Sequence, residues 1–377
     1  MKKKIAIIGS GIAGLTLANL LNKNSTFEFR VYEKTQDHII EEGYGIQLAT
    51  NAIKILNQID FNQVNQKKIY HPKMLDFYDL QNKKICELNF ERFNTQDAKY
   101  TTLQRSTLIE FLRAKVYKEY LKFDKQIKEV SQLKDKILIK FNDNTNDLVD
   151  YVVVADGIFS STRSFFEKKK NSPIFKKAIA IRTVISSKSE LQVNEQNISL
   201  FMGANVHLVV YPINQNHELN LVCIVRAKKY DPENLQTLIN EKVIAQNSNL
   251  KNLFQNKIKS FPLYATPKIL PSSNQKVFYI GDAFNGLLPT FAQGAGQSIE
   301  SAYELFNLLK KDNLNIANKY FKTRSQRIKV VRRRSNLNFL VFHISNAILQ
   351  KIRNLILKFL IKRKGFIKNY LGAVYKI

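Results

Sequence analysis

The sequence predicts an α/β protein in which a Rossmann-like nucleotide-binding domain is interleaved with a β-sheet-rich domain and followed by helices. Three observations predict this class. Residues 4–34 read as strand, glycine turn, helix and strand, and residues 275–309 repeat the strand, glycine turn and helix. Residues 177–265, between them, are rich in short strand-forming runs. Alternation of strands with helices favours a parallel sheet, whereas a run of strands alone favours a separate sheet.

The first unit carries the clearest nucleotide-binding signal. The apolar run Ile5–Ile8 leads into Gly-Ser-Gly-Ile-Ala-Gly at 9–14, and the next strand pattern ends on Glu33. The first glycine permits the tight turn, the second lets a pyrophosphate approach the backbone, and the third lets the helix pack on the strand. An acid about 20 residues further on can accept ribose hydroxyls. A glycine turn can be purely structural, but here the whole context is present, so this stretch is predicted to bind a dinucleotide.

Composition sets wider limits. A chain of 377 residues should form two domains, and its two cysteines give neither a disulfide framework nor metal-ligand spacing, which fits a reducing, cytoplasmic compartment. No run of 18 apolar residues occurs. The net charge of +28 favours acidic partners or reflects compositional drift. No nucleic-acid-binding motif is present, so no nucleic acid partner is expected.

Several elements follow the first unit in order. Closely spaced glycines at 43–45 predict a loop that approaches a flat ligand, and an amphipathic helix follows at 53–59. Residues 74–90 alternate like strands around a turn at 81–82, and residues 101–116 read as a helix with Arg105 near its start. From spacing alone, a lone arginine on a helix is a solvated surface charge.

The middle of the chain predicts more strands, at 123–130, 136–141 and 149–154. The last runs into Asp156-Gly157, with Arg163 on the same loop. Open α/β sheets bind ligands at the carboxyl ends of their strands, so this loop is a candidate site. The alternative is a glycine turn with a surface ion pair.

Four strands are predicted in the sheet-rich part, at 178–185, 198–202, 207–211 and 219–225. Side chains alternate faces along a strand, so His207 and Tyr211 point the same way. Both can then reach one bound hydroxyl. Alternatively, they are core residues with satisfied polar tips.

The second strand-turn-helix unit begins with a buried strand at 275–280. It continues through Gly281-Asp282 and a glycine-rich loop at 292–297 to a helix at 298–309. A helix amino terminus favours an anion or a polarised carbonyl, and the acid at the strand end can accept a sugar hydroxyl. Two such loops far apart in one chain indicate one long ligand held at both ends.

The tail, 313–377, is predicted to be helical and basic, with no acidic residue after Asp312. Within it, apolar residues between 348 and 360 recur at helical spacing, with lysines and arginines on or beside the other faces. Such a helix either lies on an anionic membrane or packs on the domain.

Together these stretches resemble the single-component FAD-dependent aromatic hydroxylases, the class A flavoprotein monooxygenases, and specifically their p-hydroxybenzoate hydroxylase-like fold. The resemblance rests on the fingerprint at 9–14 with Glu33, on Gly43 to Ala52, on Arg105 with two leucines, on Asp156-Gly157, and on the Gly281 to Gly296 loop. It implies bound FAD and transient NADH or NADPH. The cofactor-binding residues that we predict are Gly9, Ser10, Gly11, Ile12, Ala13, Gly14, Glu33, Lys34, Gly45, Arg105, Ile127, Asp156, Gly157, Arg163, Asp282, Pro289, Gly294, Ala295 and Gly296. The resemblance thus overrides the surface-charge interpretation of Arg105.

The same resemblance implies the order of the domains. The FAD-binding domain is expected in three segments, 1–70, 100–176 and 266–320. The substrate domain is expected at 177–265 with an excursion at 71–99, and the basic helical segment at 321–377.

Within the family, the sequence is most similar to the salicylate, 3-hydroxybenzoate and 6-hydroxynicotinate hydroxylases through His207 and Tyr211-Pro212. This resemblance implies that His207 acts as the base and that Tyr211 and Gln293 orient the substrate. It implies no metal ion in the site. One departure is Phe284-Asn285, where the family usually has a histidine on the substrate side.

The implied function is hydroxylation of a small phenolic or heteroaromatic acid with NAD(P)H and O2, through a flavin C4a-hydroperoxide. One alternative is a membrane-associated hydroxylase of a lipid-linked phenol such as a ubiquinone precursor, on the inner face of the cytoplasmic membrane. The other is a flavoprotein without hydroxylase activity. Peripheral contact with anionic membrane through the basic tail is part of the expectation, and the chain is a monomer or a homodimer.

Overall fold

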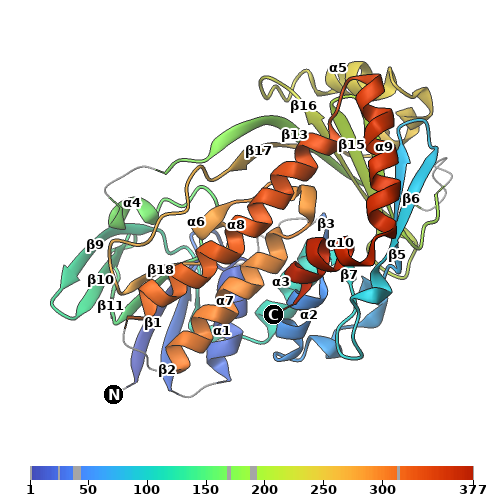
Figure 1. Ribbon diagram of the computed structural model, residues 1–377. Coiled ribbons are helices and arrows are strands. Elements are labelled where there is room, and N and C mark those ends of the chain that lie inside the picture. The colour runs from blue at the N-terminus through green and yellow to red at the C-terminus, as the bar shows by residue number, and fades with distance from the viewer. Residues whose placement is uncertain are drawn as a thin grey trace.

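The computed structural model describes residues 2–23, 26–36, 44–167, 171–186, 193–311 and 315–376. The predicted α/β arrangement is confirmed: a parallel sheet with helices occupies one end of the molecule and a larger, mostly antiparallel sheet the other (Figure 1). Gly43, which belongs to the predicted glycine loop, lies outside the described residues.

The parallel sheet has the strand order β18-β12-β1-β2-β8. Its strands are β1 (Lys3–Ile8), β2 (Phe27–Tyr32), β8 (Leu121–Lys122), β12 (Tyr151–Val154) and β18 (Val277–Tyr279). Helices α1 (Ile12–Asn22) and α7 (Gly294–Lys310) pack against each other beside it, and α3 (Arg105–Ala114) contacts α1. A parallel sheet covered in this way needs continuous apolar strands, which explains the buried runs at 5–8 and 152–154.

The larger sheet has seven strands in the order β17-β13-β16-β15-β14-β5-β6. They are β5 (Met74–Asp79), β6 (Lys84–Asn89), β13 (Ile174–Ser186), β14 (Ile198–Gly203), β15 (Val206–Pro212), β16 (Glu218–Arg226) and β17 (Lys259–Ala265). Every neighbouring pair is antiparallel except β14 with β5. The early strands β5 and β6 thus join the sheet formed by later residues, although the domain boundaries themselves stay a prediction.

Two three-stranded sheets complete the strand content. One is β3 (Gly45–Leu48), β7 (Thr101–Gln104) and β4 (Ile69–Tyr70), and the other is β11 (Asn146–Val149), β10 (Lys136–Phe141) and β9 (Ile127–Leu133). The predicted helix at 101–116 is therefore wrong in its first four residues. Thr101 and Thr102 are β-branched and find strand partners in β3 and β4, so α3 begins only at Arg105.

The tail forms α8 (Ile316–Phe342), which runs diagonally from the parallel sheet to the larger sheet, and then α9 (Ala347–Lys362) beside β6 (Figure 1). Across the described ranges, no helix is both long and apolar enough to span a bilayer. The shorter helices are α2 (Thr50–Asn57), α4 (Arg163–Phe166), α5 (Leu235–Ile239), α6 (Asp282–Asn285), α10 (Lys364–Ile367) and α11 (Ala373–Tyr375).

A buried ionic cluster attaches this tail to α7. Glu300 accepts hydrogen bonds from Arg324 at 3.2 Å and from Arg327 at 2.7 and 3.0 Å. Arg324 is 2% exposed and Glu300 6% exposed. Arg327 also donates to the backbone carbonyls of Ala373 and Lys376, so the cluster holds the end of the chain as well.

Candidate cofactor and substrate site

The loops predicted to bind the cofactor meet at one edge of the parallel sheet. Because β1, β12 and β18 are adjacent and parallel, the turns that follow them lie together. Gly9 has φ +108°, and a Cβ there would lie 2.6 Å from the carbonyl oxygen of Ala155. Gly281 has φ +59°, and its Cβ would lie 2.8 Å from that of Ala13. These two positions require glycine both for backbone conformation and for close packing of the three turns.

A cavity of about 340 Å³ lies beside these turns. Nine of the predicted cofactor-binding residues line it: Gly9, Ser10, Gly11, Glu33, Lys34, Arg105, Ile127, Asp156 and Gly157. A Cβ at Gly11 or Gly157 would have nothing within 4 Å, so both glycines face open space. Asp156 Oδ2 accepts a hydrogen bond from the Thr162 N–H, while its buried Oδ1 has no partner among the described residues. The cavity therefore offers open backbone and an unpaired acceptor, which fits a ligand with phosphates and hydroxyls.

Glu33 is already hydrogen-bonded within the protein. Its Oε2 accepts from the Ser10 N–H at 2.8 Å and the Ser10 Oγ at 3.0 Å, and its Oε1 accepts from Thr35. Burial raises the pKa of Glu33, but these hydrogen bonds outweigh it and hold the pKa below its usual value. The carboxylate is thus ionised. A bound ribose could donate its hydroxyls to Glu33 in place of the Ser10 and Thr35 hydroxyls, which can rotate away.

A second, apolar cavity of about 590 Å³ adjoins the same sheet edge. Gly45, Asp282, Pro289, Gly294 and Ala295 of the cofactor prediction line it. Asp282 is exposed to this cavity, and enclosure by the surrounding protein raises its pKa to about 6, although the charge of Arg105 lowers it. Arg105 lines the first cavity and Asp282 the second, so these two opposite charges lie where the cavities are close to each other.

The other predicted cofactor residues do not line either cavity. Ile12, Ala13 and Gly14 are buried beneath the first turn. Gly296 lies near Gln293 and Ala52. Arg163 donates to the Ala283 carbonyl at 3.0 Å and to Glu167 Oε2 at 3.1 Å, which joins the turn after β12 to α6.

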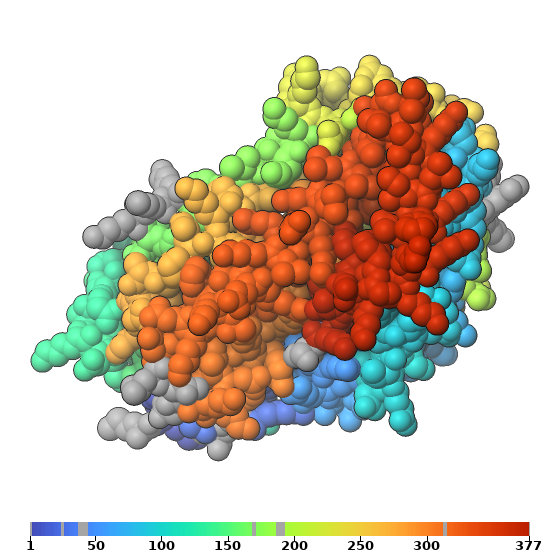
Figure 2. Space-filling model, in the orientation of Figure 1, coloured from blue at the N-terminus to red at the C-terminus, as the bar shows by residue number. Residues whose placement is uncertain are grey.

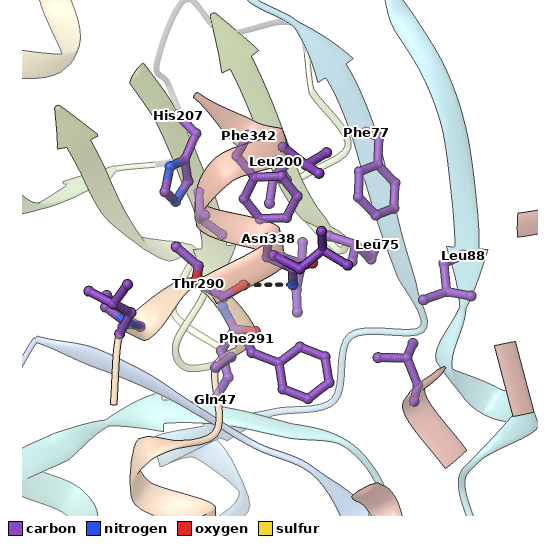
Figure 3. A pocket seen from close by; sticks show the side chains of 18 of the residues that line it. Gln47, Leu75, Phe77, Leu88, Leu200, His207, Thr290, Phe291, Asn338 and Phe342 are labelled. Carbon is purple, nitrogen blue, oxygen red and sulfur yellow. Dashed lines mark hydrogen bonds between the residues drawn. The ribbon is translucent and has the colours of Figure 1, made fainter. Parts of the chain in front are cut away.

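His207 lies in the wall of the apolar cavity and belongs to a buried pair of histidines (Figure 3). Its Nδ1 is 3.1 Å from Nε2 of His343 on the segment after α8. His343 Nδ1 lies 2.7 Å from the Phe339 carbonyl and its Nε2 lies 3.2 Å from the Ile224 carbonyl, so each ring nitrogen faces a backbone acceptor. His343 Nε2 therefore has two polar neighbours, the Ile224 carbonyl and His207 Nδ1.

We expect this pair to make stability depend on pH. Burial, together with the His343 side chain, holds the pKa of His207 well below its usual value, and burial lowers that of His343. Below about pH 6.5 the unfolded chain therefore binds more protons than the folded chain, so stability is lost as the pH falls. The unfolding temperature should drop between about pH 7 and about pH 5. His207→Gln should reduce that drop, whereas the same change at exposed His217 should not, and an equal drop in all three proteins would contradict this account.

Tyr211 and Val209 line the same cavity as His207, as the strand alternation predicted. Tyr211 is buried, which raises the pKa of its hydroxyl, and it lies near Arg182. Arg182 also lines the cavity, 6.0 Å from the Tyr44 ring, and no carboxylate in the described part of the chain pairs with it. Burial lowers its pKa. Sequence reasoning missed Arg182, although a single charge in the apolar strand 178–185 was a usable signal.

Gln293 is buried but is not among the residues that line the cavity, and its Oε1 accepts from Gln297 at 3.3 Å. Phe284 and Asn285 are also buried away from it. Phe284 packs against Tyr320, and Asn285 Oδ1 accepts from Arg332 of α8. The departure at 284–285 thus serves the contact between α6 and α8.

The fold and these turns define an α/β protein with a dinucleotide site. A family model described as "FAD binding domain" matches residues 2–318. The chain belongs to this family, and the predicted resemblance to FAD-dependent aromatic hydroxylases is confirmed. FAD is therefore its cofactor, and the open glycines and the unpaired Asp156 oxygen fit it.

Named relatives are similar over most of the chain. A 3-amino-4-hydroxybenzoate 2-monooxygenase of Streptomyces platensis is 26% identical over 94% of this chain and 92% of the relative. A salicylate hydroxylase of Pseudomonas putida is 22% identical over 81% of this chain and 76% of the relative. Klebsiella pneumoniae HpxO, solved with FAD and uric acid, superposes with a TM-score of 0.84 at 14% identity, covering 99% of this chain and 96% of HpxO. That last likeness concerns the fold.

Proposed function

We propose that this chain is a monooxygenase that hydroxylates the ring of a phenolic or heteroaromatic acid, using FAD, NAD(P)H and O2. The observation that carries the proposal is the apolar cavity, whose wall contains both predicted cofactor residues, such as Asp282 and Gly294, and the substrate-side residues His207 and Tyr211. The names of the relatives support the reaction class, since they act on hydroxybenzoates and salicylates.

Bound FAD supplies the activation of O2, and the protein must position and deprotonate the substrate. We assign His207 as the proton acceptor for a phenol, and burial, which holds its pKa well below the usual value, keeps it neutral before the reaction. The unpaired guanidinium of Arg182 is placed to bind the carboxylate, and Tyr211 lies near it to orient the ring. The apolar walls keep water from the site.

The test is an NAD(P)H-oxidation screen of the FAD-loaded protein against phenolic acids and their neutral amides, with product analysis. We expect acids to stimulate oxidation and to yield hydroxylated product. Arg182→Met should raise KM for the acid about 10- to 100-fold, from a lost charge-assisted hydrogen bond of about 1.5–3 kcal/mol, and should change KM for the amide little. Oxidation without hydroxylated product for every acid would support the flavoprotein without hydroxylase activity instead.

We further propose that α9 contacts an anionic membrane surface. Ile348, Leu355 and Phe359 are 69%, 67% and 56% exposed, and Leu349, Ile352 and Ile356 are also exposed on this helix. Lys351, Lys358 and Lys362 lie on the same helix, and no acidic residue follows Asp312. Figure 2 shows this red-orange helix at the surface of the molecule. An exposed apolar row with flanking cations is typical of helices that lie in a bilayer interface.

Co-sedimentation with vesicles tests this contact. Deletion of the tail is unsuitable, because Phe342 and Tyr375 belong to the buried core. We expect the protein to bind phosphatidylserine-containing vesicles more than purely phosphatidylcholine vesicles, and Leu355→Asp with Phe359→Asp to remove the binding. Leu148→Asp, at an exposed leucine in β11, is the matched control. Binding that is unchanged by the α9 substitutions would refute the contact.

A further inference from the structure

The apolar cavity extends well beyond the side chains that suit an aromatic acid. From β5, β6 and β14, the residues Leu75, Phe77, Leu88 and Leu200 line it. Figure 3 shows His207 and Leu88 at opposite sides of the view, with Phe342 and Leu200 between them. Leu88, Phe77 and Leu200 are 3%, 7% and 6% exposed, so this end of the cavity lies in the interior of the protein.

The size of the cavity bears on what fills it. An apolar cavity of about 150 Å³ holds one benzene. The present cavity, at about 590 Å³, has several times that volume. Under the proposal above, the flavin occupies the end of the cavity near Asp282 and Gly294. The end near Leu75 and Leu88 lies against the seven-stranded sheet. A ring with a carboxylate and a hydroxyl would leave this second end without a ligand.

The cavity also reaches the surface through apolar residues. Leu337 of α8 and Leu349, Ile352 and Ile356 of α9 line the cavity and are 49%, 52%, 45% and 51% exposed. These α9 residues belong to the same exposed row that we propose to contact the membrane. Arg353 is the charged side chain at this end; its guanidinium donates to Asn354 Oδ1 and to the Val341 carbonyl, and its buried Nη2 has no partner among the described residues. An opening rimmed by leucine and isoleucine offers apolar contacts to a hydrocarbon chain.

We infer that the substrate is an aromatic acid whose ring carries an extended apolar chain, and that it enters through the opening beneath α9. The chain lies among Leu75, Leu88 and Leu200, while the ring lies at His207 and Arg182. This inference rests on the proposed function for the position of the ring, and it adds the chemical class of the substituent and the direction of entry.

The experiment titrates the FAD-loaded protein with hydroxybenzoates that carry methyl, butyl, octyl or dodecyl chains on the ring, and follows the flavin absorbance change to obtain Kd. We expect Kd to fall by about fourfold per added methylene until the chain fills the cavity. Leu88→Trp, which fills the inner end, should weaken octyl binding by at least about tenfold and methyl binding little. Ile356→Trp, at the rim, tests the same prediction without altering a buried position, and Leu355→Trp, exposed and outside the cavity lining, is the control.

Equal Kd values for the methyl and octyl compounds, or equal effects of Ile356→Trp and Leu355→Trp on octyl binding, would overturn the inference. Product analysis separates it from the proposed function. Binding that depends on chain length but gives no hydroxylated product would refute the hydroxylase and leave the alkyl-chain site standing. Hydroxylation that does not depend on chain length would refute the alkyl-chain site and leave the hydroxylase standing.

Discussion

Gly11→Val is expected to fold like the parent chain and to purify without FAD. A Cβ at this position meets nothing within 4 Å, and the φ of −76° suits any residue, so the fold loses nothing. The added side chain would occupy the space that the pyrophosphate needs at the amino terminus of α1. Loss of two charge-assisted contacts of about 1.5 kcal/mol or more each should raise the Kd for FAD at least about a hundredfold.

The measurement is FAD titration by flavin fluorescence quenching, with the thermal unfolding of the flavin-free protein as the check on folding. Gly365→Val is the matched control, because a Cβ there also meets nothing within 4 Å while Gly365 lies in α10, outside both cavity linings. An unchanged Kd for FAD in Gly11→Val would mean that this turn does not face the cofactor.

Glu300→Gln is expected to destabilise the protein by about 3 kcal/mol, because Arg327 loses its carboxylate and the buried Arg324 keeps only Glu304, at 3.6 Å. The loss should also release the end of the chain, since Arg327 holds the carbonyls of Ala373 and Lys376. Urea unfolding of the flavin-free protein measures the change in free energy, and proteolysis near the carboxyl terminus reports the release.

The comparison for this prediction is Glu110→Gln. Glu110 pairs with Lys68 at 3.3 Å, but both side chains are about half exposed, so its loss should cost about 1 kcal/mol or less. Similar losses in the two variants would contradict the view that burial makes the Glu300 cluster important for stability.

The cofactor end could be predicted because its signal is local. Gly9, Gly11 and Glu33 have the spacing that is typical of a strand, glycine turn, helix and strand unit. The structure has these elements as β1, α1 and β2. The strand alternation likewise placed His207 and Tyr211 on one face without knowledge of the partner strands.

What could not be predicted depends on contacts between distant residues. Thr101 and Thr102 form a strand because β3, from about fifty residues earlier, supplies the partner backbone. The partner of His207 is His343, 136 residues away. Helix α9 contributes to the cavity wall because the tail folds back onto β6. The periodicity of its apolar residues fits both a helix packed on the domain and a helix on a membrane, so it could not predict this contact.

The most direct test of the whole account is the FAD stoichiometry of the purified chain, from the absorbance of released flavin against protein concentration. The convergence of the turns after β1, β12 and β18 on one edge predicts a single FAD per chain, lost in Gly11→Val and retained in Gly365→Val. A colourless protein that takes up no added FAD would contradict the assignment of these turns to the cofactor.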